Sequence, residues 1–192
     1  MRLFSDRKKT KQFLIYVYLN METTLEQKRL ENLRKYQILD TPQDGSFDEI
    51  TSLAVKIFDV PIAIISLVDT DRIWFKSAYG LDIDEIPKAP GLCSSAILSD
   101  DIYIVENARK DPRTLTNPLV TGALGLQFYA GAPLITKERF RLGNFVIIDA
   151  KPRRLNGKES SMLIQLSRIV MDRVELQLEA RQLVQELNGG MS

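Results

Sequence analysis

The sequence predicts a single α+β domain with a central antiparallel sheet of five or six strands, flanking helices and a long C-terminal helix. Two apolar stretches, residues 62–79 and 128–148, have strand-like patterns with an internal turn and are therefore expected to be hairpins. Helical patterns precede the first hairpin and follow the second. This order favours an antiparallel sheet with helices packed against it over alternating parallel units. With 192 residues, 44 % of them apolar, the chain can fill one such core.

Two helices are expected before the first hairpin. Residues 23–27, TTLEQ, hold two overlapping capping boxes that begin a helix over residues 24–36. Ser46 and Glu49 form another capping box, which begins a second helix ending near residue 58. The expected buried stripe of this second helix is Phe47, Ile50, Leu53, Ala54 and Ile57.

Residues 1–22 are expected to be a poorly ordered leader, first basic and then apolar. Its apolar run at residues 13–19 is too short to span a bilayer, and no signal-peptide cleavage site follows it. The folded domain is therefore expected over residues 24–178.

The strands follow from changes in periodicity. Residues 62–68 are almost continuously apolar, which predicts a strand covered on both faces. Residues 73–79 alternate and form the second strand of the hairpin, and residues 80–91 are expected to be an irregular crossover. A short helix is predicted at 93–98 and a short strand at 102–105. The closing hairpin pairs 128–135 with 142–148.

A helical pattern over residues 158–188 predicts a C-terminal helix whose end extends beyond the domain. Leu163, Val170 and Val174 form a stripe for the sheet. A second seam has the 4, 3 spacing of a heptad repeat and one polar break. Its members are Met162, Leu166, Ile169, Arg173, Leu176, Ala180, Leu183 and Leu187.

The end of this seam is the expected dimer interface, formed by Leu176, Ala180, Leu183 and Leu187. Left in water, each Å² of apolar surface costs about 25 cal/mol, and pairing with a second copy removes that cost. The alternative is that the last turns fray, because two heptads alone make a marginal coiled coil.

The residue types that are missing exclude much enzyme chemistry. The chain has no histidine and one cysteine, Cys93. Catalytic triads and Cys-His pairs need an imidazole, zinc sites draw on several His or Cys ligands, and globin-type haem needs a proximal His. We therefore expect a binding module without catalytic residues or a metal. A single cysteine cannot form an internal disulfide, which favours the cytoplasm.

The charge distribution argues against nucleic acid as a partner. Residues 1–20 carry five basic side chains and one acidic one, a net +4, while the whole chain is +1. The remaining 172 residues therefore sum to −3, which lacks the basic footprint that nucleic-acid binding requires.

A series of motifs resembles bacterial sensory GAF domains. They are LRKYQILDTP at residues 33–42, SLVDTDRIWFK at 66–76, DPR at 111–113, NPLV at 117–120 and FYAGAPL at 128–134. The resemblance covers about residues 29–180 and implies a GAF fold, with helices on one side of the sheet and a small-molecule pocket on the other. It also implies a sensory role, relayed through the flanking helices to an output domain or partner such as a kinase or cyclase.

Two departures from this family pattern affect the expected chemistry. Many relatives have Phe-Cys-Ala-His where this chain has Leu92-Cys93-Ser94-Ser95, and a cysteine where it has Val146. Both changes remove groups that bind metal or do redox chemistry. They argue against haem, zinc and a covalently attached bilin, since photoreceptor relatives usually have histidine after the attachment cysteine and this chain has Ser94.

The candidate ligand-binding residues are aromatic, polar or sulfur-containing side chains near these motifs: Trp74, Cys93, Ser95, Phe128, Tyr129 and Arg113. Arg72 and Arg113 either read an anionic ligand or pair with neighbouring carboxylates. Two alternatives stay open. One is a reductase like the free methionine sulfoxide reductases, with Cys93 as nucleophile, although those enzymes use several cysteines. The other is a dimerisation module without a ligand.

Overall fold

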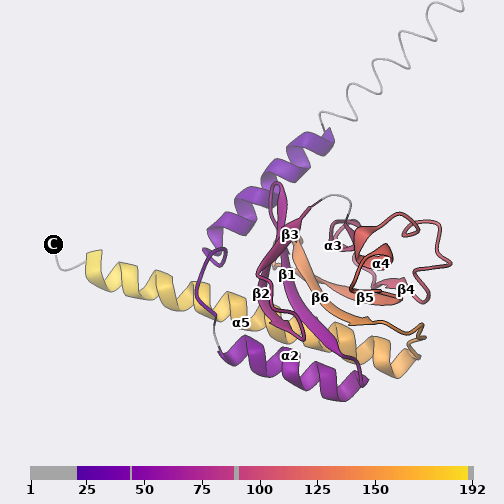
Figure 1. The fold of residues 1–192 in the computed structure, drawn as a ribbon. Coiled ribbons are helices and arrows are strands. Elements are labelled where there is room, and N and C mark those ends of the chain that lie inside the picture. The colour runs from indigo at the N-terminus through magenta and orange to yellow at the C-terminus, as the bar shows by residue number, and fades with distance from the viewer. Residues whose placement is uncertain (1–20, 44, 89–90, 190–192) are drawn as a thin grey trace, which may run out of the picture.

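The computed structural model describes residues 21–43, 45–88 and 91–189. One antiparallel sheet of six strands lies between two layers, as Figure 1 shows. Helices α2 and α5 cover one face, and α3, α4 and long loops cover the other. After a helix over residues 21–35 the elements are α2 (Gly45–Phe58), β1 (Ile62–Val68), β2 (Arg72–Tyr79), β3 (Glu85–Pro87), α3 (Leu92–Ala96), β4 (Tyr103–Val105), α4 (Pro118–Thr121), β5 (Phe128–Ile135), β6 (Arg141–Asp149) and α5 (Gly157–Gly189).

The strand order β3-β2-β1-β6-β5-β4 confirms the predicted antiparallel sheet and both hairpins. The hairpins β1–β2 and β5–β6 join at the centre, where β1 pairs with β6. That junction is tight, because a Cβ at Gly143 would lie 1.8 Å from the carbonyl oxygen of Ser66. The two edge strands have three residues each. One of them, β3, lies in the segment that the sequence predicted as irregular, and its Pro87 is tolerated because an edge position needs no donor on both sides.

The sheet buries side chains on both faces, as the apolar run in β1 predicts. All seven β1 residues are buried. Ala63, Ile65 and Leu67 belong to the core beneath α2 and α5, which we call the helix-side core. Ile62, Ile64 and Val68 belong to a second core beneath α3 and the loops, which we call the loop-side core.

The buried stripe of α2 differs from the predicted one. Its buried residues are Phe47, Thr51, Ala54 and Phe58, whereas Leu53 is 50 % and Ile57 is 38 % exposed. The prediction was wrong at Leu53 and Ile57 because Thr51, a polar residue, occupies the inner face. Its hydroxyl pairs with the Ser77 hydroxyl at 2.8 Å, so a hydrophobicity pattern cannot find it.

Helix α5 packs on the sheet along its first two thirds and then leaves the domain (Figure 1). Asn156 and Glu159 form a capping box at its start, with each side chain bonded to the other's backbone N–H. The buried residues are Leu163, Leu166, Ser167, Val170, Met171, Val174 and Leu178. Arg181 still donates to the carbonyl oxygen of Tyr36 at 2.8 Å, while residues 182–188 are all exposed.

The outer seam of α5 faces solvent in this single chain. Leu176 is 64 % exposed, Leu183 60 % and Leu187 71 %, and Ala180 is also exposed. Leu166 instead lies in the helix-side core. Within the described residues, no helix is long and apolar enough to cross a membrane. The leader predicted over residues 1–22 lies outside the described chain up to residue 20, and residues 21 and 22 are helical.

Candidate ligand-binding pocket

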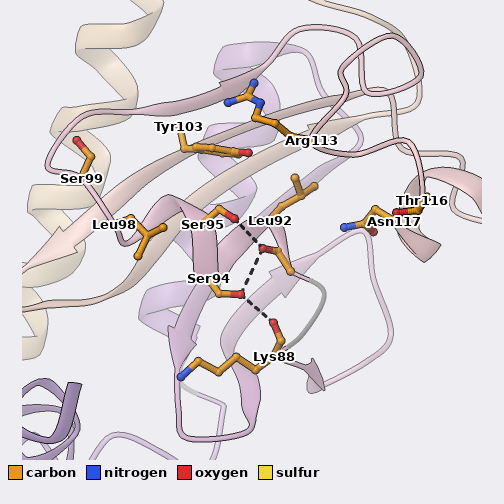
Figure 2. Close-up of a pocket in the computed structure, with 11 residues that line it drawn as sticks. Lys88, Leu92, Ser94, Ser95, Leu98, Ser99, Tyr103, Arg113, Thr116 and Asn117 are labelled. Atoms are coloured by element: carbon orange, nitrogen blue, oxygen red, sulfur yellow. Dashed lines mark hydrogen bonds between the residues drawn. The ribbon is translucent and has the colours of Figure 1, made fainter. Parts of the chain in front are cut away.

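A pocket of about 810 Å³ lies on the loop-covered face of the sheet, opposite α2 and α5. Figure 2 shows that its lining comes from α3, from β4 and from the loop before α4. The lining residues are Lys88, Gly91, Leu92, Ser94, Ser95, Leu98, Ser99, Tyr103, Arg113, Thr116 and Asn117. A few polar groups on a partly apolar wall are typical of small-molecule sites.

The wall formed by α3 depends on hydrogen bonds within its own turn. Ser94 Oγ donates to the Lys88 carbonyl oxygen at 2.8 Å, and Ser95 Oγ donates to the Gly91 carbonyl oxygen at 3.2 Å (Figure 2). A Cβ at Gly91 would lie 2.4 Å from that Lys88 oxygen, so the turn requires glycine. These contacts hold the two serines at the pocket wall although α3 has only five residues.

Arg113 and Tyr103 form the opposite wall. The guanidinium carbon lies 4.7 Å from the centre of the Tyr103 ring, a cation–π contact. Arg113 Nε donates to Asp111 at 2.9 Å and Nη2 donates to the carbonyl oxygen of Ile104 at 3.0 Å. The hydrogen bond from Arg113 holds the pKa of the Asp111 carboxyl below its usual value, so this pair stays ionised at neutral pH.

Cys93 faces the core instead of the pocket. It is buried, and the Tyr129 hydroxyl donates to its sulfur at 3.4 Å. Burial raises the pKa of the Cys93 thiol and also that of Tyr129. The thiol is therefore neutral at pH 7, the opposite of the lowered pKa that activates catalytic cysteines.

Asn144 connects α3 to the centre of the sheet. It is fully buried on β6, and its Nδ2 donates to the Cys93 carbonyl oxygen at 2.9 Å. Its Oδ1 has no hydrogen-bond partner among the described residues. Asn144 therefore has a role in positioning the pocket wall.

Of the six candidate residues from the sequence, two line the pocket: Ser95 and Arg113. Cys93 and Tyr129 are buried in the loop-side core beneath it, whereas Phe128 is buried in the helix-side core on the opposite face of the sheet. Tyr129 contacts the pocket wall indirectly, with its ring centre 6.1 Å from that of Tyr103. Trp74 lies on the other face of the sheet, in the helix-side core.

The sequence left open whether Arg72 and Arg113 bind an anionic ligand or pair with neighbouring carboxylates. The structure shows that the two arginines differ in their partners. Arg72 uses all three guanidinium nitrogens, on Asp69, Glu85 and Asp40. It ties the segment after the first helix to β2 and β3, and it lies outside the pocket lining. Arg113, in contrast, pairs with a single carboxylate, that of Asp111, among the residues that the structure describes.

Sequence reasoning missed Tyr103 and Asn117. Asn117 appeared only within the family motif NPLV, yet its side chain caps α4 by accepting from the Leu119 N–H at 2.9 Å. Its position before a proline was a usable signal, since Asn is a preferred N-cap and proline a preferred first helical residue. Tyr103 gave no comparable signal, because one aromatic residue on a short strand is most often core.

Comparison with known proteins identifies similar chains. The sequence matches the GAF domain family over residues 44–178. It is 41 % identical over 138 residues to a cyclic di-GMP phosphodiesterase of Pseudomonas aeruginosa, covering 71 % of this chain and 24 % of that protein. The chain thus spans about a quarter of this relative's length.

Solved structures share the fold at low sequence identity. The GAF domain from an Acinetobacter phosphoenolpyruvate-protein phosphotransferase has a TM-score of 0.59 and 18 % identity, over 81 % of this chain and 93 % of that one. A free methionine-R-sulfoxide reductase from Neisseria meningitidis, solved with its substrate, has a TM-score of 0.59 and 17 % identity, over 76 % and 87 %. One fold is therefore found both in a domain of a phosphotransferase and in a reductase, so the function of this chain has to be argued from its site.

Proposed function

Because this chain belongs to the GAF domain family, we propose that it is a non-catalytic sensory domain that binds a small molecule in the pocket between α3, β4 and the loop before α4. The observation that carries the proposal is the separation of pocket and thiol. The pocket is lined by hydroxyls, leucines and Arg113, while Cys93 is buried beneath it and neutral.

We propose that occupancy of the pocket reaches the rest of the domain through α3. A ligand against Ser94 and Ser95 contacts α3, whose Cys93 carbonyl is bonded to Asn144 at the centre of the sheet. Asn144 lies on β6, and the opposite face of β6 packs against α5. A shift of α3 is thereby transmitted through one hydrogen bond and one strand to the helix that leaves the domain.

Helix α5 is the proposed output contact of the domain. Leu176, Ala180, Leu183 and Leu187 form its exposed seam, and a two-fold pairing of this seam in a homodimer removes the apolar surface from water. The proposed partner is an enzyme that this domain regulates. The family resemblance implies a kinase or a cyclase, and the similarity to a cyclic di-GMP phosphodiesterase adds a phosphodiesterase as a third class. The lone reduced cysteine is the reason to place the sensor in the cytoplasm.

The rival function is reduction of free methionine sulfoxide by Cys93. The similarity to known reductases favours it, but a reductase needs an accessible thiolate and a resolving thiol, and this chain has one buried cysteine. We expect no turnover of free methionine sulfoxide above background, with or without Cys93→Ser. Turnover that disappears in Cys93→Ser would replace the sensory proposal with the enzyme.

Native mass spectrometry of freshly purified protein tests the sensory proposal itself. We expect a dimer in which each chain carries a small molecule that leaves at moderate collision energy. A dimer without bound mass, and without any thermal stabilisation by metabolite mixtures, would contradict ligand sensing and leave the domain as a dimerisation module.

A further inference from the structure

One end of the domain carries an excess of positive charge. It comprises residues 56–59 at the end of α2, residues 106–113, and residues 149–159, from the end of β6 to the first turn of α5. We call this surface the basic end. Its three segments hold eight basic and five acidic side chains, a net charge of +3. Residues 21–192 sum to −3, so the difference leaves −6 on the rest of them. Positive charge is therefore concentrated at this end.

Two arginines hold the three segments together. Arg153 donates from its backbone N–H to the Glu106 carbonyl oxygen at 3.0 Å, and from Nη1 to the Phe58 carbonyl oxygen at 3.3 Å. Its side chain also pairs with Asp149, and Arg154 Nε donates to the Glu106 carboxylate at 3.0 Å. Figure 1 shows the end of α2 and the start of α5 at the same end of the molecule, away from the C-terminal end of α5. The segments therefore form one surface although they are distant in sequence.

Five exposed basic side chains of the basic end make no hydrogen bond, ion pair or ring contact with the residues that the structure describes. They are Lys56, Arg109, Lys110, Lys151 and Lys158. Elsewhere in the described chain, three exposed cations are equally unpaired: Lys28, Arg34 and Arg168. Of the carboxylates in the basic end, only that of Asp59 has no partner. The surplus positive charge is therefore exposed and is not neutralised within the domain.

The five unpaired cations are suited to an extended anionic surface. Four of them are lysines, which carry a hydrated point charge on a flexible stem, whereas the fixed pairs of this end use Arg153 and Arg154. They come from α2, from two loops and from the first turn of α5, and none of them lines the ligand pocket. They are thus spread over a surface instead of converging on one small ion.

The side chains between these cations favour a membrane over a nucleic acid. The aromatic residue of the basic end, Phe58, is buried, so its ring is not exposed for stacking on a base. Ile57 is 38 % exposed beside Lys56, and Pro152 is exposed beside Lys151. Segments that lie on lipid headgroups combine basic side chains with exposed apolar ones in this way.

From these observations we infer that the basic end binds the surface of a membrane that contains anionic lipids. Each basic side chain near such a surface raises the partition of a protein onto it about fivefold. Binding in this way directs the exposed end of α5 away from the membrane (Figure 1). The basic end lies apart from the ligand pocket, so its binding to a membrane does not depend on the proposed function.

Co-sedimentation of the intact chain with lipid vesicles tests the inference. Vesicles of equal parts phosphatidylglycerol and phosphatidylcholine are compared with vesicles of phosphatidylcholine alone. In about 0.1 M salt, where charges act over about 10 Å, we expect binding to the mixed vesicles and none to phosphatidylcholine. In about 1 M salt, where this distance falls to about 3 Å, we expect the protein to be released.

Two triple variants with the same change in charge locate the binding surface. The test variant replaces three lysines of the basic end: Lys110→Gln, Lys151→Gln and Lys158→Gln. The control variant replaces the three unpaired cations elsewhere: Lys28→Gln, Arg34→Gln and Arg168→Gln. Partition onto the mixed vesicles should fall at least about a hundredfold in the test variant and less than about threefold in the control. Residues 1–20, which carry a net +4, are the same in both, so the difference between the variants reports on the basic end alone.

Circular dichroism should first show that both triple variants are folded. No binding to the mixed vesicles, equal binding to phosphatidylcholine alone, or equal losses in the two variants would overturn the inference. Soluble polyglutamate and duplex DNA are the remaining probes. An unmodified protein that binds either of these but not the mixed vesicles would assign the basic end to an acidic protein segment or a nucleic acid, and would also overturn the membrane.

Discussion

The two faces of the sheet are stabilised in different ways. On the helix side, α2 and α5 bury mainly apolar stripes, each interrupted by one polar residue (Thr51 and Ser167), and the core contains large side chains such as Phe47 and Phe145. On the loop side, the covering elements are a five-residue helix, a four-residue helix and long loops, held by individual hydrogen bonds. The comparison shows why the pocket lies where it does: long amphipathic helices close one face, and short elements leave space on the other.

Truncating the helix-side core should have the largest effect. Phe47→Ala removes a fully buried ring between α2 and the sheet, and we expect the free energy of unfolding to fall by about 3–5 kcal/mol in urea denaturation. Leu53→Ala, on the exposed side of the same helix, should change it by less than about 0.5 kcal/mol. Equal losses for the two variants would mean that α2 is rotated from the orientation described here.

The exposed end of α5 should control assembly without affecting either core. Leu176→Glu with Leu183→Glu places charges on the outer seam, so we expect a folded monomer by light scattering at tens of micromolar. The unmodified protein should be a dimer under the same conditions. If it is already a monomer, the seam is not an interface.

On the loop side, a single hydrogen bond should matter more than apolar volume. Asn144→Ala leaves the buried Cys93 carbonyl without its donor, and we expect a loss of about 1–3 kcal/mol. Hydrogen exchange should accelerate first in α3. If α3 keeps its protection while α2 and α5 lose theirs, Asn144 does not hold the pocket wall.

The smallest effect is expected at Glu26, which connects the first helix to Lys88 beside the pocket. Hydrogen bonding from Arg29 lowers the pKa of Glu26 to about 2, against the partial burial that raises it. Because the pKa is lower in the folded state, the stabilisation is present above about pH 4.5 and is lost as the pH falls toward 2. The carboxylate is 39 % exposed, so Glu26→Gln should cost at most about 1 kcal/mol at pH 7. The difference in unfolding free energy between the unmodified protein and Glu26→Gln should shrink as the pH falls from 4.5 to about 2. A difference that grows over this range would mean that folding raises the pKa of Glu26 instead of lowering it.

The contrast between the two faces also explains what the sequence could predict. Both hairpins and the long helix follow from periodicity, because continuous stripes are needed to bury a sheet. The inner face of α2 was missed at Thr51, where a hydroxyl pair takes the place of a leucine. In the pocket, Ser95 and Arg113 were named as ligand candidates, whereas Tyr103 and Asn117 were not, although Asn117 lies in a family motif and precedes a proline. The importance of Tyr103 depends on its ring contact with Arg113 of a following loop, which no local period encodes.

The central claim is that the pocket, and not Cys93, is the functional site. Native mass spectrometry tests it directly on the unmodified protein, on Ser95→Phe, which fills the pocket, and on Cys93→Ala, which removes the thiol beneath it. Circular dichroism should first show that both variants are folded. We predict that the bound small molecule is retained by Cys93→Ala and lost from Ser95→Phe. Loss of the bound mass in Cys93→Ala with retention in Ser95→Phe would contradict the account and assign the function to the thiol.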